Sequence, residues 1–131
     1  MTGQGCQHVV LVVEDDHDVR QAIAEVLEDN SYRAVEVANG REAIEALRAR
    51  AATCKPCLIL LDIMMPVMDG REFLEQQRQD PDLSDIPVVV LSAHASLDES
   101  ASDLRAAAYL RKPIRAETLL SAVRRLCPIA A

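Results

Sequence analysis

Two hydrophobic patterns alternate along the chain. Short aliphatic runs of strand length, bounded by polar or turn residues, occupy 8–13, 32–37, 57–61, 87–91 and 107–110. The segments between and after them carry apolar residues at helical spacing, most clearly at Leu119, Leu120, Val123 and Leu126. The pattern predicts five repeats of a strand followed by a helix, of which the fourth helix, over about 97–106, has the weakest pattern.

Such a repeat predicts an α/β fold, with a five-stranded parallel sheet covered by five helices on its two faces. The runs at 8–13, 57–61 and 87–91 are apolar almost throughout, as strands buried on both faces must be. The run at 32–37 alternates instead, which suits an edge strand. We expect one domain over 8–127, a flexible tail at 1–7 and a short tail at 128–131.

Composition and charge narrow the classes of function. Half of the 131 residues are apolar but only 2% are aromatic, so the core must be mostly aliphatic. The net charge is −7 and no block of Lys or Arg is present, which argues against a nucleic-acid interface. The apolar runs are too short to span a bilayer, and the N-terminus lacks the features of a secretion signal. We expect a cytoplasmic protein that binds neither nucleic acid nor membrane.

The four cysteines are expected to be free thiols in such a protein. Cys54 and Cys57 have the C-x-x-C spacing of redox and zinc pairs. A redox pair gains its reactivity at a helix N-terminus, however, and this pair precedes an apolar run. A zinc site would need two further ligands, and Cys6 and Cys127 are isolated in the sequence. We therefore interpret Cys54 and Cys57 as loop and strand-start residues, with a redox or metal role as the less favoured alternative.

Polar residues follow four of the five predicted strands. Ligands of open α/β sheets bind beyond the carboxyl ends of the strands, and adjacent strands lie about 4.8 Å apart. Helix capping explains an aspartate at a helix start, but it does not explain an acid after a buried strand or a lysine after the last strand. The sequence therefore predicts one site at this rim, formed from Glu14, Asp15, Asp62, Ser92 and Lys112, whereas capping can explain Asp16.

These residue types suit phosphoryl transfer. Carboxylates held close together repel one another unless a cation joins them, and oxygen ligands in a hydrated site favour Mg²⁺. Lys112 and the Ser92 hydroxyl would complement a phosphoryl group. An aspartate can be the nucleophile that forms an acyl phosphate, and such chemistry requires mainly positioning and charge neutralisation. Our hypothesis is that Asp62 accepts a phosphoryl group.

The stretches "LVVEDDHDVR", "LILLDIMMPVMDG", "DPDLSDIPVVVLSA" and "YLRKPI" resemble, in order and spacing, the receiver domains of two-component response regulators. The resemblance implies the flavodoxin-like strand order 2-1-3-4-5. It implies a sensor histidine kinase or a histidine phosphotransfer protein as phosphodonor, in a two-component system or phosphorelay, and a downstream protein partner. The chain would not be an enzyme acting on a separate substrate, although it would catalyse its own phosphorylation and dephosphorylation at Asp62.

The resemblance also assigns the acceptor and the metal ligands. Asp62 would be the phosphoacceptor. Mg²⁺ would bind Asp15, Asp62 and the backbone carbonyl of Met64, with Glu14 acting largely through water. Met64 and His94 stand at variable positions that tune dephosphorylation in the family, although His94 is equally well read as an exposed loop histidine.

Further roles follow for the phosphate ligands and the switch. Ser92, the Ala93 amide and the Lys112 ammonium would hold the phosphoryl oxygens. Ser92 and Tyr109 would form the switch, in which the tyrosine rotamer follows Ser92. The Lys112–Pro113 peptide would be cis.

Two alternatives belong to other classes of protein. Asp16-His17-Asp18 resembles the D-x-D pair of haloacid-dehalogenase-type phosphatases, but Arg20 stands where that family has Thr or Val, and Asp62 would have no role. A phosphorylation-independent interaction module could share the receiver fold. Such modules usually lose the acceptor or the lysine, and this chain keeps both.

The chain departs from the receiver pattern between Ser92 and Lys112. This segment is shorter than usual by about two residues and lacks the Gly before the fifth strand. The stretch "SLDESASDLRAA" offers few large apolar side chains to offset the entropy of ordering a helix. We therefore expect residues 95–106, part of the family's usual output face, to form a short or irregular helix that is more mobile than the other four.

Overall fold

The fold is known from a computed structural model that describes residues 8–50, 55–62, 70–92 and 106–129. Five parallel strands form one sheet in the order β2-β1-β3-β4-β5. They are β1 (Val9–Val13), β2 (Arg33–Val37), β3 (Leu58–Asp62), β4 (Val88–Ser92) and β5 (Ala108–Arg111). The predicted α/β class and the strand order implied by the resemblance are confirmed.

The described helices number four rather than the expected five. They are α1 (His17–Asp29), α2 (Gly40–Arg50), α3 (Gly70–Gln79) and α5 (Ala116–Leu126). The fourth helix was expected over about 97–106, and 93–105 lie outside the described residues, as does the expected tail at 1–7. Within the described ranges, no helix has the length and apolar character needed to cross a membrane.

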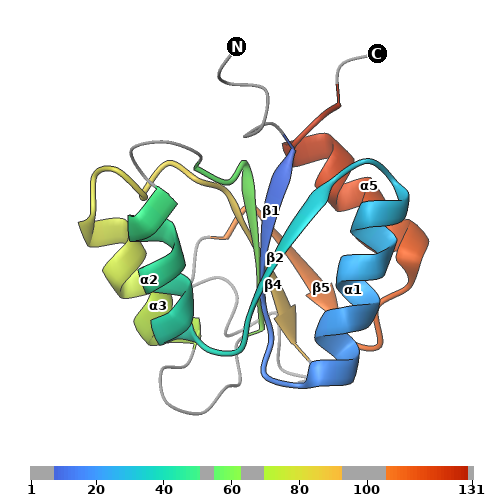
Figure 1. Cartoon of the computed structure of the whole chain (residues 1–131), viewed down its shortest axis with the longest axis horizontal. Coiled ribbons are helices and arrows are strands. Elements are labelled where there is room, and N and C mark those ends of the chain that lie inside the picture. Colours follow the sequence, from blue (N-terminus) through green and yellow to red (C-terminus); the bar gives the residue numbers. More distant parts are fainter. Residues whose placement is uncertain (1–7, 51–54, 63–69, 93–105, 130–131) are drawn as a thin grey trace.

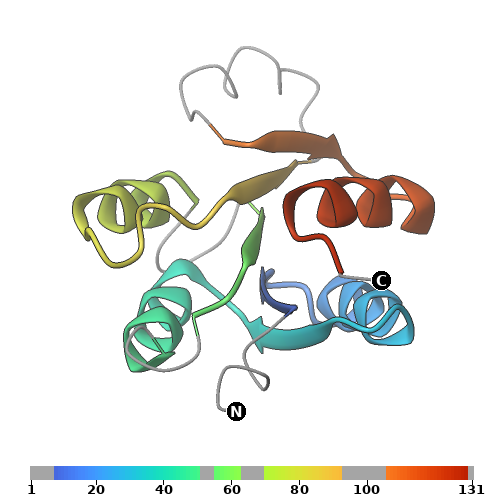
Figure 2. The same ribbon diagram turned by 90° about the horizontal axis from the view of Figure 1, so that it is seen from above.

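The helices cover both faces of the sheet, with α2 and α3 on one face and α1 and α5 on the other (Figures 1 and 2). Successive strand residues point to opposite faces, which divides the core into two clusters. Leu11 and Ile59 belong to the cluster under α2 and α3. Their neighbours Val10 and Leu58 belong to the cluster under α1 and α5. This alternation decides on which face each side chain at the strand ends emerges.

The burial of the strands follows their place in the sheet. Every residue of β1, β3 and β4 is buried, which explains why these runs are almost continuously apolar. Strand β2 lies at one edge and is partly exposed, as its alternating sequence predicts. Strand β5 lies at the opposite edge and is half-buried over most of its length.

Side-chain caps begin two of the helices immediately after their strands. Asp16 caps α1 by accepting hydrogen bonds from the amides of Asp18, at 3.0 Å, and Val19, at 3.2 Å. At α2, Asn39 accepts from the Glu42 amide and Glu42 accepts from the Ala38 amide, both at 2.9 Å, an arrangement that resembles a capping box shifted by one residue. These caps satisfy backbone amides at the helix starts.

The expectation of four free thiols is wrong for two of the cysteines. A disulfide joins Cys57 to Cys127, whose Cα atoms lie 5.9 Å apart, across a sequence separation of 70 residues. The sequence analysis misjudged this pair because α5 runs back along the sheet and returns the chain to the amino end of β3. Cys6 and Cys54 lie outside the described residues. Past the disulfide, Ile129 is half-buried against the α1 and α5 cluster.

Candidate functional site

Three carboxylates meet at the carboxyl ends of β1 and β3. Glu14 directly follows β1, and Asp62 is the last residue of β3. The register of the two strands makes Glu14 and Asp62 neighbours. One oxygen each from Glu14, Asp15 and Asp62 lie within 4.8 Å of one another. Glu14 and Asp62 are only 1% and 4% exposed, whereas Asp15 faces solvent. The structure thus brings together the acids that the sequence assigned to one site.

Lys112 enters this acidic group from the end of β5. Its Nζ lies 2.6 Å from a Glu14 carboxylate oxygen and 3.5 Å from an Asp62 carboxylate oxygen. Its backbone amide donates to the Ser92 carbonyl at 2.8 Å, which continues the pairing of β4 and β5 by one residue. Alternation along the strands places all three charged side chains toward the α1 and α5 face. The Lys112–Pro113 peptide is cis, as the resemblance implied.

The charge on Lys112 is stabilised by its acidic neighbours. Burial by itself would lower the pKa of Lys112, but the hydrogen bond to Glu14 and the charge of Asp62 outweigh it, so the pKa is raised. The lysine therefore stays protonated at neutral pH. Its ammonium partly neutralises the two buried carboxylates.

Arg20 fixes the backbone that carries Glu14, a role that the sequence analysis did not identify. From α1, its guanidinium donates to the Glu14 carbonyl at 2.9 Å and lies 3.4 Å from a Glu36 carboxylate oxygen. A third guanidinium contact, at 3.1 Å, reaches His17 Nδ1. The Glu14 amide donates to the Val37 carbonyl, so both backbone groups of Glu14 are held. No sequence signal marks Arg20, because its partners depend on the packing of α1 beside β2.

Ser92 and Tyr109 occupy neighbouring strands on the other face. Ser92 ends β4 and is buried. Tyr109 on β5 pairs with Val90, and it packs half-buried against the α2 and α3 cluster. Its hydroxyl accepts a hydrogen bond from the Ala106 amide at 2.9 Å. Ser92 follows Val90 by two residues, so the side chains of Ser92 and Tyr109 lie on the same face of the sheet.

The donor set fits a hard divalent cation. Glu14, Asp15 and Asp62 offer only carboxylate oxygens, and the exposed Asp15 leaves one side of the group open to water. Mg²⁺ prefers one or two carboxylates together with water and phosphate oxygens. The further assigned groups, the Met64 carbonyl, the Ala93 amide and His94, lie outside the described residues.

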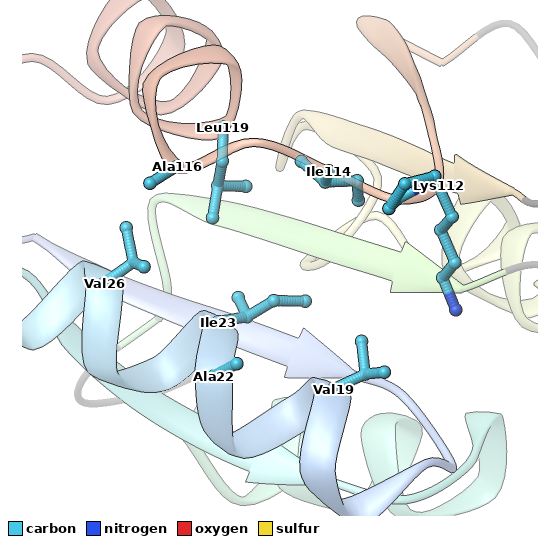
Figure 3. Close-up of a pocket in the computed structure, with 9 residues that line it drawn as sticks. Val19, Ala22, Ile23, Val26, Lys112, Ile114, Ala116 and Leu119 are labelled. Carbon is cyan, nitrogen blue, oxygen red and sulfur yellow. The ribbon is translucent and has the colours of Figure 1, made fainter.

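An apolar groove of about 480 Å³ leads away from the site between α1 and the start of α5. Figure 3 shows Val19, Ile23 and Val26 of α1 along one wall, with Leu119 of α5 across from them. Lys112 stands at the end of the groove where the strands end, with its ammonium directed toward that rim (Figure 3). The groove and the acidic group therefore adjoin through one side chain.

Comparison with known proteins decides the family. The family model of the response regulator receiver domain matches residues 10–124. The chain belongs to this family. Receiver domains typically bind Mg²⁺ at an acidic pocket, and they interact with histidine kinases. The chain is thus a receiver domain of the response regulator type, as the sequence motifs indicated.

Individual relatives agree with this assignment. Response regulator MprA of Mycolicibacterium vanbaalenii is 39% identical over 119 residues, which cover 89% of this chain and 49% of the relative. The chain spans about half the length of the curated relatives that it matches. Chemotaxis protein CheY4 of Vibrio cholerae superposes with a TM-score of 0.81 at 29% identity, covering 92% of this chain and 98% of that one. The phosphorylated cyanobacterial phytochrome response regulator RcpA gives a TM-score of 0.75 at 33% identity, with 91% and 90% covered.

The dehalogenase-type alternative gains no support. Asp16 serves as the N-cap of α1, with its side chain engaged by backbone amides. The carboxylates that meet are those of Glu14, Asp15 and Asp62. The D-x-D spacing at Asp16 and Asp18 is therefore explained by a helix start.

Proposed function

We propose that Asp62 accepts a phosphoryl group from the phosphohistidine of a sensor histidine kinase or a histidine phosphotransfer protein. One observation carries the proposal: a buried carboxylate ends the central strand, with a lysine ammonium 3.5 Å away and two further acids around it. RcpA, which resembles this chain along most of its length, is known in a phosphorylated form. The proposal extends that chemistry to Asp62.

The transfer forms one bond and breaks one bond. A carboxylate oxygen of Asp62 attacks the phosphorus, the phosphorus–nitrogen bond of the donor breaks, and the imidazole leaves with a proton. Mg²⁺, when bound, supplies positive charge against the phosphoryl oxygens and the acids. Glu14, Asp15 and Asp62 would hold that ion. Lys112 would move its ammonium from Glu14 toward the phosphoryl oxygens and neutralise charge there.

Hydrolysis and signalling complete the proposed cycle. Water attacks the phosphorus of the acyl phosphate and regenerates Asp62, at a rate that Met64 and His94 would tune. The chain would thus catalyse its own phosphorylation and dephosphorylation without acting on a separate substrate. For signalling, Ser92 would turn toward the phosphoryl group and Tyr109 would follow, which requires breaking the bond between the Ala106 amide and the Tyr109 hydroxyl. A downstream protein would bind the rearranged face.

The apolar groove is proposed to receive the phosphodonor. A helix with an apolar face can pack between α1 and α5, where Val19, Val26 and Ile114 present half-buried aliphatic side chains. The groove ends at Lys112, so a histidine on such a helix would be delivered beside Asp62. Continuity with the acceptor distinguishes this face from the rest of the surface. A cytoplasmic location, where such donors would meet the chain, is part of the proposal.

Labelling with acetyl phosphate and Mg²⁺ tests the acceptor without a protein donor. We expect wild-type protein and Asp16→Asn to be labelled, because Asp16 acts as a cap, and we expect Asp62→Asn to give no label. Intact-protein mass spectrometry measures the added phosphoryl group. Labelling of Asp62→Asn equal to that of the wild type would refute Asp62 as the acceptor, and an unlabelled wild type would favour a phosphorylation-independent interaction module.

A further inference from the structure

The Cys57–Cys127 disulfide joins the most deeply held strand of the sheet to a helix at the surface. Cys57 directly precedes β3, in which every residue is buried. Cys127 is the C-cap of α5 and is 5% exposed, whereas Cys57 is half-buried. The bridge therefore fastens the last turn of α5 to the amino end of the central strand.

Several attachments hold helix α5 at this end, in addition to its buried side chains Leu119 and Val123. Its N-cap residue, Arg115, makes no side-chain capping bond, so the start of the helix lacks one common form of support. At the C-terminal end, the Cys127 carbonyl accepts from the Tyr32 hydroxyl at 2.8 Å. Arg124 donates to Asn30 at 3.1 Å in an exposed contact, which contributes little. The disulfide is the one covalent attachment among them.

The surroundings also accommodate the reduced pair. The Cys57 sulfur lies 3.3 Å from the Val9 carbonyl oxygen, so a thiol at this position has an acceptor when the bridge is open. Cys127 packs in the apolar cluster under α1 and α5, where a thiol behaves as a small hydrophobic group. The fold therefore offers the Cys57 thiol a hydrogen-bond acceptor and the Cys127 thiol an apolar environment.

We propose that Cys57 and Cys127 form a reversible thiol–disulfide site, which exchanges with dithiols and disulfides and determines how tightly the C-terminal end of α5 is held. The disulfide and the reduced pair both fit the fold, and Cys57 is held in place by the sheet because it directly precedes β3. The change on opening the bridge therefore falls on α5. The proposal is independent of phosphoryl transfer, because the bridge lies at the end of the sheet opposite Asp62.

Exchange begins at the more accessible sulfur. A thiolate of a dithiol attacks the Cys57 sulfur, the bond to Cys127 breaks, and Cys127 leaves as a thiolate that takes up a proton. The second thiol of the reagent then displaces Cys57 and closes the reagent into a cyclic disulfide. The protein gains two electrons and two protons, and the reagent loses the same number. An oxidised dithiol reverses both steps.

Two measurements on the full chain with Cys6→Ser and Cys54→Ser test the site, since only Cys57 and Cys127 then remain. The first treats folded protein with dithiothreitol or its oxidised form, alkylates it and determines the mass. We expect no alkylated cysteine after oxidation, two after reduction, and none after reoxidation. Alkylated cysteines in the oxidised protein, or a bridge that opens only under denaturing conditions, would overturn the proposal.

The second measurement follows amide hydrogen exchange in both redox states. We expect exchange in the last turn of α5 to accelerate on the order of tenfold or more after reduction, with that of α2 unchanged. Cys127→Ser in the same background should match the reduced protein under either condition. Equal exchange of α5 in both states would contradict the proposal. Acetyl phosphate labelling should not depend on redox state, and failure to label in either state would count against Asp62 and not against the bridge.

Discussion

The amino and carboxyl ends of the sheet differ in how their buried polar groups are paired. At the amino end, polar side chains satisfy backbone carbonyls: Tyr32 donates to Cys127, and Gln77 donates to Leu83 at 2.8 Å and Ile86 at 3.1 Å. At the carboxyl end, Glu14 and Asp62 are buried as carboxylates beside one ammonium. The amino end of the sheet thus pairs its buried polar groups in neutral hydrogen bonds, whereas the carboxyl end holds charged groups together in the core.

The difference shows how one fold can be both stable and reactive. Neutral hydrogen bonds at the amino end lower the cost of burying polar groups, and the disulfide adds a covalent constraint. At the carboxyl end, two buried acids share Lys112 as a counter-charge, so an added cation or phosphoryl group can change the balance of charge. We therefore expect substitutions at the amino end to alter stability, and those at the carboxyl end to alter chemistry.

The largest effect on stability should come from Gln77→Met. This change keeps the apolar volume but removes both donors, leaving two buried carbonyls without those partners. We expect the free energy of unfolding to fall by about 2–4 kcal/mol, measured by urea denaturation. Gln79→Met at the exposed end of α3 is the matched control and should change it by less than about 0.5 kcal/mol. If Gln77→Met kept normal stability but could not be phosphorylated by acetyl phosphate, the amino end of the sheet would determine chemistry rather than stability, which would contradict this comparison.

A smaller effect is expected from Asp15→Asn, this time on metal binding. The substitution removes one of three carboxylates, so the affinity for Mg²⁺ should fall about tenfold or more, which corresponds to roughly 1.4 kcal/mol. Stability without the ion should stay equal or rise, because repulsion decreases. Calorimetric titration measures the first effect and urea denaturation the second. Asp18→Asn is the matched control outside the acidic group, and an unchanged affinity in Asp15→Asn would refute the site.

The smallest effect should appear at alkaline pH. The pKa of Lys112 is raised in the folded state, so its contribution is fully present below the ordinary value of 10.5 and is lost as the pH rises through the higher folded value. Burial raises the pKa of Tyr32 from 10.0 in the same direction, against a lowering by Arg124. The free energy of unfolding should therefore decline above about pH 10. Urea denaturation at a series of pH values measures this decline. In Lys112→Met and in Tyr32→Phe, the free energy of unfolding should fall less steeply with pH than in the wild type. An unchanged pH dependence in Lys112→Met would contradict the coupling to Glu14 and Asp62.

Much of this arrangement follows from local sequence. Hydrophobic period located all five strands to within about one residue, and Asp62 and Ser92 proved to be strand-terminal residues. The parallel topology then places both residues at the same rim of the sheet, with their side chains on opposite faces. The cap at Asp16 was equally local, because a side chain and two nearby amides decide it.

The remaining features depend on contacts between distant segments. The pairing of Cys57 with Cys127 and the bond from Tyr32 to Cys127 exist only because α5 packs along the sheet. The role of Arg20 depends likewise on how α1 sits beside β2. Strand order came from the resemblance, since periodicity contains no information about which strands are neighbours. The roles assigned to the site residues stay predictions, and Met64, Ala93 and His94 also lie outside the described residues.

The residue that accepts the phosphoryl group can be identified by chemical trapping. Borohydride reduces an acyl phosphate to an alcohol, so an aspartyl phosphate is converted into homoserine. After acetyl phosphate treatment with Mg²⁺ and borohydride reduction, peptide sequencing by mass spectrometry should find homoserine at position 62 and aspartate at positions 15, 16 and 18. Homoserine at any of those three positions, or a phosphorylated protein that retains aspartate at 62, would contradict phosphoryl transfer to the end of β3.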